Sequence, residues 1–102
     1  MLLKTNREKV YRISKAIRIG RVQICVGGCE SVASGAYAEN YFSRPFIDNN
    51  VFVFTVPNQS GYYRRVGVVR DVYADRFEWQ VYNDTNDRYV RGGRYIAIGF
   101  WK

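Results

Sequence analysis

Apolar and polar residues alternate with a period of two along most of the chain from residue 18 onward. Successive side chains of a strand point to opposite faces, so this alternation predicts β-strands. Gly, Asn, Asp and Ser gather between the apolar runs, as turns require. The pattern therefore predicts an all-β sandwich or barrel of antiparallel strands. The expected strands cover residues 18–26, 37–45, 51–57, 63–72, 76–82 and 91–100.

The residues before this region follow a helical period instead. Val10, Ile13 and Ile17 are spaced to share one face of a short amphipathic helix, which we expect over residues 6–16. A helix this short is not stable alone in water, so it must pack against something. Either three copies bundle through these three residues, or the helix lies against its own sheet. The expected organisation is an N-terminal helical arm over 1–17 and a β-domain over 18–102.

Two of the expected strands are apolar on both faces. In "VFVFTV" (51–56) both alternating sets are apolar or nearly so, and the same holds for "YIAIGF" (95–100). In 76–82, by contrast, only Phe77, Trp79 and Val81 form an apolar set. Each sheet of a sandwich has one solvent-exposed face, so a single copy cannot bury all these residues. We expect self-association to cover the excess, and we expect the closing strand to be central in its sheet or covered by another subunit.

The composition narrows the class of function. The chain of 102 residues has no histidine, which removes the commonest general base, the catalytic triads that depend on it and most transition-metal sites. Cys25 and Cys29 alone cannot form a zinc site, and we interpret them as reduced thiols. If Gly27 and Gly28 between them form a hairpin turn, the two thiols face other residues. We expect no catalysis, no metal and no cofactor.

Basic residues are concentrated at the N-terminus. Residues 1–21 carry seven basic side chains and one acidic side chain, which accounts for +6 of the net charge of +7. The remaining residues are therefore nearly balanced, which argues against a nucleic-acid groove on the β-domain. No apolar run is long enough to span a membrane as a helix, and the opening residues do not form a signal peptide. We expect folding in a cytoplasm without membrane insertion.

Four stretches together resemble the H-type lectin domain and the related C-terminal tips of bacteriophage tail fibres. They are "RIGRVQI", "YFSRPFIDNNVFVFTV", "VGVVRDVYADRFEWQVYN" and "RYIAIGF". The resemblance implies a six-stranded antiparallel β-sandwich that forms a homotrimer and performs no catalysis. It also implies that the closing strand lies near the threefold axis, with Tyr95, Ala97 and Gly99 at the interface. The small Ala97 and Gly99 would allow close approach there, and Ile96 and Ile98 would fill the core.

The same resemblance implies a carbohydrate site at the seam between protomers. It would combine an arginine of the fourth strand with polar or aromatic residues in the loop after the fifth. Amide, carboxylate and guanidinium groups can hydrogen-bond sugar hydroxyls, and an aromatic ring can cover the apolar face of a sugar. The polar residues are equally suited to a solvated hairpin turn. The candidate site residues are Arg64, Arg65, Tyr82, Asp84, Thr85 and Asn86.

The sequence thus favours a receptor-binding module of a phage or prophage tail fibre, which would bind a cell-surface glycan and contact other virion proteins through its arm. One alternative is a small basic nucleic-acid-binding barrel, in which Tyr62, Tyr63 and Trp79 would stack on bases. Another is a structural virion protein with the same fold and no ligand.

Overall fold

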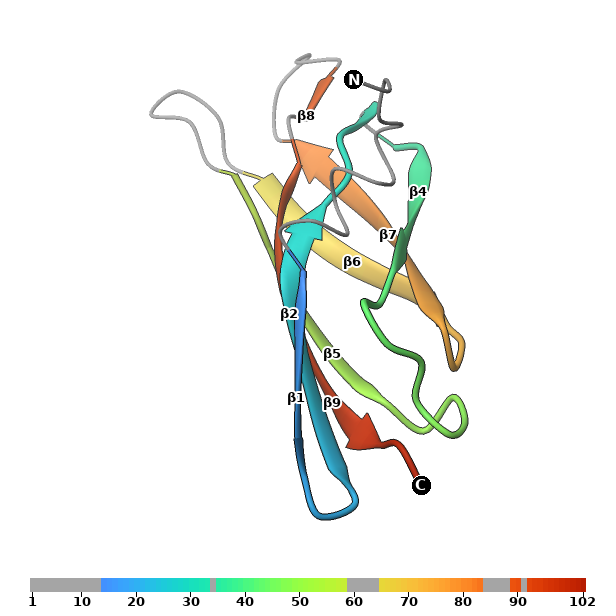
Figure 1. Cartoon of the computed structure of the whole chain (residues 1–102). Helices are drawn as coiled ribbons and strands as arrows, with labels where there is room; N and C mark the ends of the chain where they lie inside the picture. The colour runs from blue at the N-terminus through green and yellow to red at the C-terminus, as the bar shows by residue number, and fades with distance from the viewer. Residues whose placement is uncertain (1–13, 34, 59–64, 84–88, 91) are drawn as a thin grey trace, which may run out of the picture.

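The computed structural model describes residues 14–33, 35–58, 65–83, 89–90 and 92–102. This part of the chain forms two antiparallel sheets that face each other as the layers of a β-sandwich (Figure 1). The predicted all-β class is confirmed. No helix occurs among the described residues, and therefore none that is long and apolar enough to cross a membrane.

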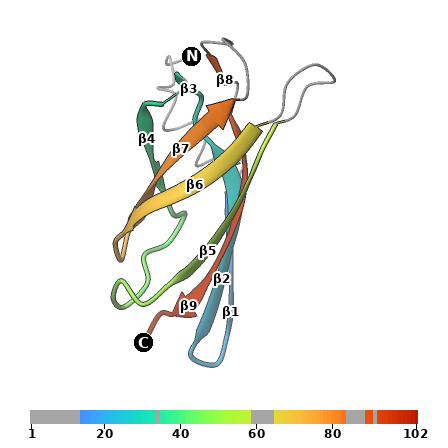
Figure 2. The same ribbon diagram turned by 180° about the vertical axis from the view of Figure 1, so that it is seen from behind.

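The larger sheet has four strands in the order β1-β2-β9-β5. The closing strand β9 pairs with β2 along one side and with β5 along the other, so the prediction that it is central in its sheet is confirmed. The chain end lies beside this sheet, at the end where the β1–β2 hairpin turns (Figures 1 and 2). The strands are β1 (Lys15–Ile19), β2 (Val22–Cys29), β5 (Phe52–Pro57) and β9 (Gly93–Phe100).

The smaller sheet has three strands in the order β4-β7-β6, with a register shift in β6 between Val69 and Val72. A pair of two-residue strands, β3 and β8, lies at the end of the sandwich away from the chain end (Figure 2). The strands are β4 (Tyr37–Tyr41), β6 (Arg65–Val72), β7 (Arg76–Asn83), β3 (Val32–Ala33) and β8 (Tyr89–Val90).

The first sheet begins earlier than the sequence predicted. The helix was expected to reach residue 16, but Lys15 and Ala16 belong to β1, where they pair with Val26 and Cys25. The expected strand 18–26 is in fact a hairpin, because Gly20 takes a positive φ of 58° and turns the chain. The β-domain therefore starts before residue 18, and the rest of the expected helix lies outside the described residues.

The "CVGGC" segment does not turn. β2 continues through Gly27 and Gly28, which pair with Tyr95 and Arg94 of β9. A Cβ atom at Gly27 would overlap the Ser14 hydroxyl and lie 3.0 Å from the Tyr95 ring. This glycine thus permits the close approach of two side chains, and it does not form the hairpin that the sequence suggested.

Aromatic side chains from both sheets and the connecting loop fill the core. Phe42 packs against Phe46 with ring centroids 4.9 Å apart, and Phe77 packs against Tyr95 at 5.0 Å. The indole of Trp79 is fully buried and donates a hydrogen bond of 3.1 Å to the Glu30 carbonyl. Phe77, Trp79 and Val81 face inward from β7, which confirms the one-sided pattern predicted for this strand.

Candidate functional site

The outer side of the four-stranded sheet is almost entirely apolar. Its side chains alternate with the buried set on every strand, so they point away from the core. Phe52 and Ile19 are each 68% exposed, and Val56 is 61% exposed. We call this surface the apolar face. It consists of Ile17, Ile19, Val22, Ile24, Val26, Phe52, Phe54, Val56, Ile96, Ile98 and Phe100.

The strand register joins these side chains into one continuous patch. Ile17, Ile24, Ile98 and Phe52 pair in sequence across all four strands and form a single row. From ordinary strand spacing, four strands about five residues long cover roughly 350 Å² of flat sheet. The largest apolar patch on a protein surface is often functional, so this face is a candidate site for contact with another molecule.

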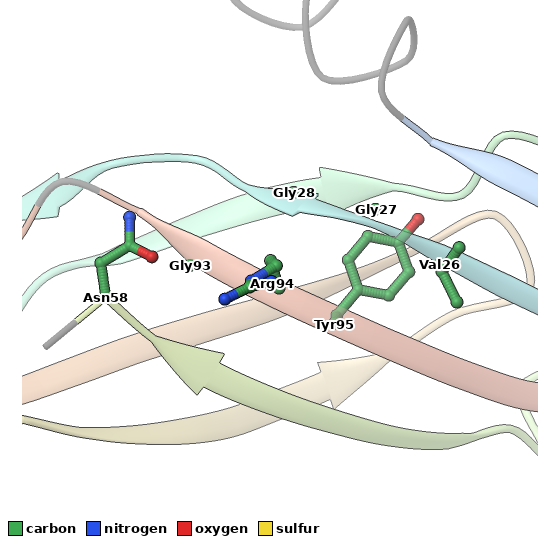
Figure 3. Close-up of a pocket in the computed structure, with 7 residues that line it drawn as sticks. All are labelled: Val26, Gly27, Gly28, Asn58, Gly93, Arg94 and Tyr95. Carbon is green, nitrogen blue, oxygen red and sulfur yellow. The ribbon is translucent and has the colours of Figure 1, made fainter.

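The apolar face is hollowed where β2 and β9 lack large side chains. One open hollow of about 460 Å³ is lined by Val26, Gly27, Gly28, Asn58, Gly93, Arg94 and Tyr95. In Figure 3, Arg94 lies between Asn58 and Tyr95 along this hollow. A second hollow of about 310 Å³ lies beside Phe54, Val56 and Ile96. These hollows offer recesses into which side chains of a bound molecule can fit.

The outer side of the three-stranded sheet is more polar, although Val66 and Val68 are also exposed on it, and we call it the polar face. It carries arginines, glutamates and tyrosines in cross-strand contact. Arg76 donates to Glu39 at 2.6 Å and lies 4.1 Å from the centre of the Tyr73 ring. Arg70 lies 4.3 Å from the ring centre of Tyr37. The hydrogen bond to Glu39 raises the pKa of Arg76, so this guanidinium stays charged. These groups stabilise one another in water and need no cover.

The predicted interface residues of β9 point the other way. Tyr95, Ala97 and Gly99 face the core, with Ala97 fully buried and Tyr95 only 4% exposed. The small residues make room for the aromatic core, since a Cβ atom at Gly99 would lie 2.9 Å from the Phe46 ring. The prediction that these three residues approach a symmetry axis is therefore wrong for this strand. Ile96 and Ile98, which were expected inside, belong to the apolar face.

Of the three predicted interface residues of the arm, only Ile17 is described. It lies on the apolar face and is 57% exposed, although on a strand and not on a helix. Val10 and Ile13 lie outside the described residues. Most residues of the apolar face could not be predicted from the sequence. When both alternating sets of a strand are apolar, the period-two pattern does not show which set points toward the core. On the neighbouring strand β2, Gln23 and Cys25 are buried. They pair with Gly99 and Ala97, which therefore lie on the inner face of β9.

The predicted carbohydrate residues are only partly described. Arg65 lies on the inner side of β6 and donates a hydrogen bond of 2.7 Å to the Asn58 carbonyl at the end of β5. Tyr82 lies on the outer side of β7, paired with Val66, and is 48% exposed. The structure thus places these two residues on opposite faces of the sheet. Arg64, Asp84, Thr85 and Asn86 lie outside the described residues.

Cys25 and Cys29 are free, buried thiols on β2. Four residues of extended strand separate their Cα atoms by about 13 Å, well beyond the roughly 7 Å that a disulfide allows, so they cannot pair while β2 is intact. Burial raises the pKa of the Cys29 thiol from 9.0 to about 12 and also raises that of Cys25. Neither thiol is therefore suited to act as a nucleophile near neutral pH.

The raised pKa of Cys29 makes stability depend on pH. The unfolded thiol ionises above pH 9.0, whereas the folded one keeps its proton to about pH 12. The stabilisation is complete below pH 9.0 and declines at up to about 1.4 kcal/mol per pH unit above it, until about pH 12. Urea unfolding should therefore show that Cys29→Ala loses less stability than the unsubstituted protein between pH 8 and pH 10. Parallel losses in the two proteins would contradict the assigned burial.

No group of three or more cysteine, aspartate or glutamate side chains in the described ranges could hold a metal ion. Comparison of this chain with protein-family models, with curated proteins and with solved structures found no match in any of the three.

Proposed function

We propose that this protein is a non-enzymatic receptor-binding module of the phage or prophage tail-fibre kind. It assembles as a homotrimer through the apolar face and binds surface glycans. The observation that carries the assembly is the continuous apolar row across all four strands of the larger sheet. Covering this row removes apolar surface from water, which is the main driving force for protein association.

The assignment to adhesion rests on two further points. The four sequence stretches resemble the H-type lectin and tail-fibre tip family, in which the domain recognises sugars. The chain also lacks histidine, the commonest general base, and the buried thiols have raised pKa values that disfavour a thiolate nucleophile. A virion location follows from the same resemblance.

Substitution of Ile96 by lysine tests the assembly. Ile96 pairs with Val26 on one side and Phe54 on the other, so it lies in the middle of the apolar face. A charge there would be desolvated in a trimer, which is strongly unfavourable. Light scattering after size-exclusion chromatography should give three times the chain mass for the unsubstituted protein and one chain mass for Ile96→Lys.

Val66→Lys is the matched control, because Val66 is 61% exposed on the other sheet. This variant should remain trimeric. A monomeric unsubstituted protein at micromolar concentration, or equal dissociation of both variants, would overturn the proposed interface. Glycan recognition is tested separately on a glycan array with the assembled protein, and an array without any signal would leave only a structural role in the virion.

A further inference from the structure

Cationic and aromatic side chains gather at the end of the sandwich where the β1–β2 hairpin turns. The Arg18 guanidinium lies 4.2 Å from the ring centre of Trp101, and the Lys102 ammonium lies 4.9 Å from the same centre. Two positive groups thus share one indole. No Asp or Glu carboxylate of the described residues lies within ion-pair distance of either group.

The indole is held firmly in place. Its ring nitrogen donates a hydrogen bond of 2.8 Å to the Gly20 carbonyl, and the Trp101 backbone nitrogen donates to the Arg21 carbonyl at 3.0 Å. Both acceptors belong to the β1–β2 turn. The ring position is therefore fixed by the same turn that brings Arg18 and Arg21 to this end of the molecule.

The guanidinium of Arg18 is also oriented, by a buried amide. Its Nε donates a hydrogen bond of 2.7 Å to the side-chain oxygen of Gln23. Gln23 is fully buried, and its nitrogen donates to the backbone carbonyls of Arg44 at 2.9 Å and Pro45 at 3.3 Å. These bonds fix the orientation of the Gln23 amide. Its oxygen therefore accepts from the Nε edge of the Arg18 guanidinium.

The terminal nitrogens of Arg18 remain available for a ligand. They form no hydrogen bond with any residue that the structure describes. A guanidinium that is fixed through Nε and stacked on a ring presents its two terminal N–H groups as a planar pair, the geometry that binds a carboxylate or a phosphate with two hydrogen bonds. The Lys102 ammonium adds a second positive charge beside it.

We propose that Arg18, Lys102 and Trp101 form a binding site for an oxyanion. Within the proposed function, on which this part rests, the oxyanion is the carboxylate of an acidic sugar or a phosphate group carried by a surface glycan. Trp101 holds the Arg18 guanidinium in place through the face of its ring, and Arg18 binds the charged group. This site is separate from the apolar face and requires no second copy.

The two tryptophans allow a direct test by NMR on the ¹⁵N-labelled full chain. The protein is titrated with glucuronate, inorganic phosphate, glucose and sodium chloride, with the first two matched to sodium chloride in ionic strength. The Trp101 indole N–H signal should shift and saturate with glucuronate or phosphate. The Trp79 indole is buried and bonded to Glu30, so its signal is an internal reference that should not move.

The variant Arg18→Gln should weaken binding by about tenfold or more, the loss expected when a charge-assisted contact is removed. Arg18→Lys keeps the charge but not the planar donor pair, and should restore only part of the affinity. Arg70→Gln removes the same charge from the polar face and should bind normally. Thermal unfolding of each variant shows whether it is folded.

A shift with glucuronate alone identifies a sugar carboxylate, and a shift with phosphate alone identifies a phosphate group. Both outcomes support the site. Equal shifts with sodium chloride, no saturable shift with either anion, or unchanged affinity in Arg18→Gln would overturn it. These results do not depend on whether the protein is a trimer or gives signals on a glycan array, so a failure of the proposed function is recognised separately.

Discussion

Replacing Trp79 by alanine should lower the free energy of unfolding by about 3–5 kcal/mol. Trp79 has no exposed surface, lies on the middle strand of the smaller sheet and pairs with Val69 and Ala38 on its two sides. A domain of this size is stable by about 5–15 kcal/mol in total, so the loss is a large share. Urea unfolding followed by circular dichroism measures it.

Two further variants separate the causes of this loss. Trp79→Phe keeps most of the apolar volume but leaves the Glu30 carbonyl without its indole donor, and should cost about 1–3 kcal/mol. Trp101→Ala removes an equal side chain from the half-exposed rim and should cost clearly less than Trp79→Ala. If the two alanine variants lost the same stability, the described core would be wrong.

Substitution of Gly93 by alanine should be the most damaging change to the backbone of the larger sheet. β9 runs so close to β5 here that a Cβ atom would overlap the Val56 carbonyl and lie 2.8 Å from the Pro57 Cα. It would also lie 3.0 Å from the Trp79 ring. Backbone atoms cannot rotate away, so the two strands must separate. We expect a loss of several kcal/mol, of the order of an overpacked core or more.

Gly20→Ala provides the comparison, because no atom lies within 4 Å of its added Cβ. Its cost comes only from the positive φ of 58° and should be about 1–2 kcal/mol. Urea denaturation of both variants measures the difference. Equal losses would show that strand proximity at Gly93 has no special effect.

The sequence was a good guide to the strands and a poor guide to their faces. In β7, charged residues alternate with Phe77, Trp79 and Val81, so the inward set could be predicted from this segment alone. In β9 both sets are apolar, and local periodicity gives no preference. Phe46, which packs over Gly99, helps to determine the inner face, and it comes from a distant loop.

The start of the first strand was predicted wrongly for a related reason. Ile17 fits both a helical period with Ile13 and a strand period with Ile19, and a short window does not distinguish them. Pairing of Lys15–Ile19 with β2 determines the outcome, and such pairing depends on a partner further along the chain. Gly20 was the available signal, since a glycine within an alternating run often marks a turn.

The contrast between the apolar face and the polar face determines which substitutions such a protein can accept during evolution. The apolar face and the polar face belong to different sheets, which pack against each other around the aromatic core. Substitutions among Tyr37, Arg70 and Arg76 therefore change the chemistry of one outer surface and leave the side chains of the apolar face as they are. A fold built in this way can diversify one surface while the opposite surface and the core stay constant.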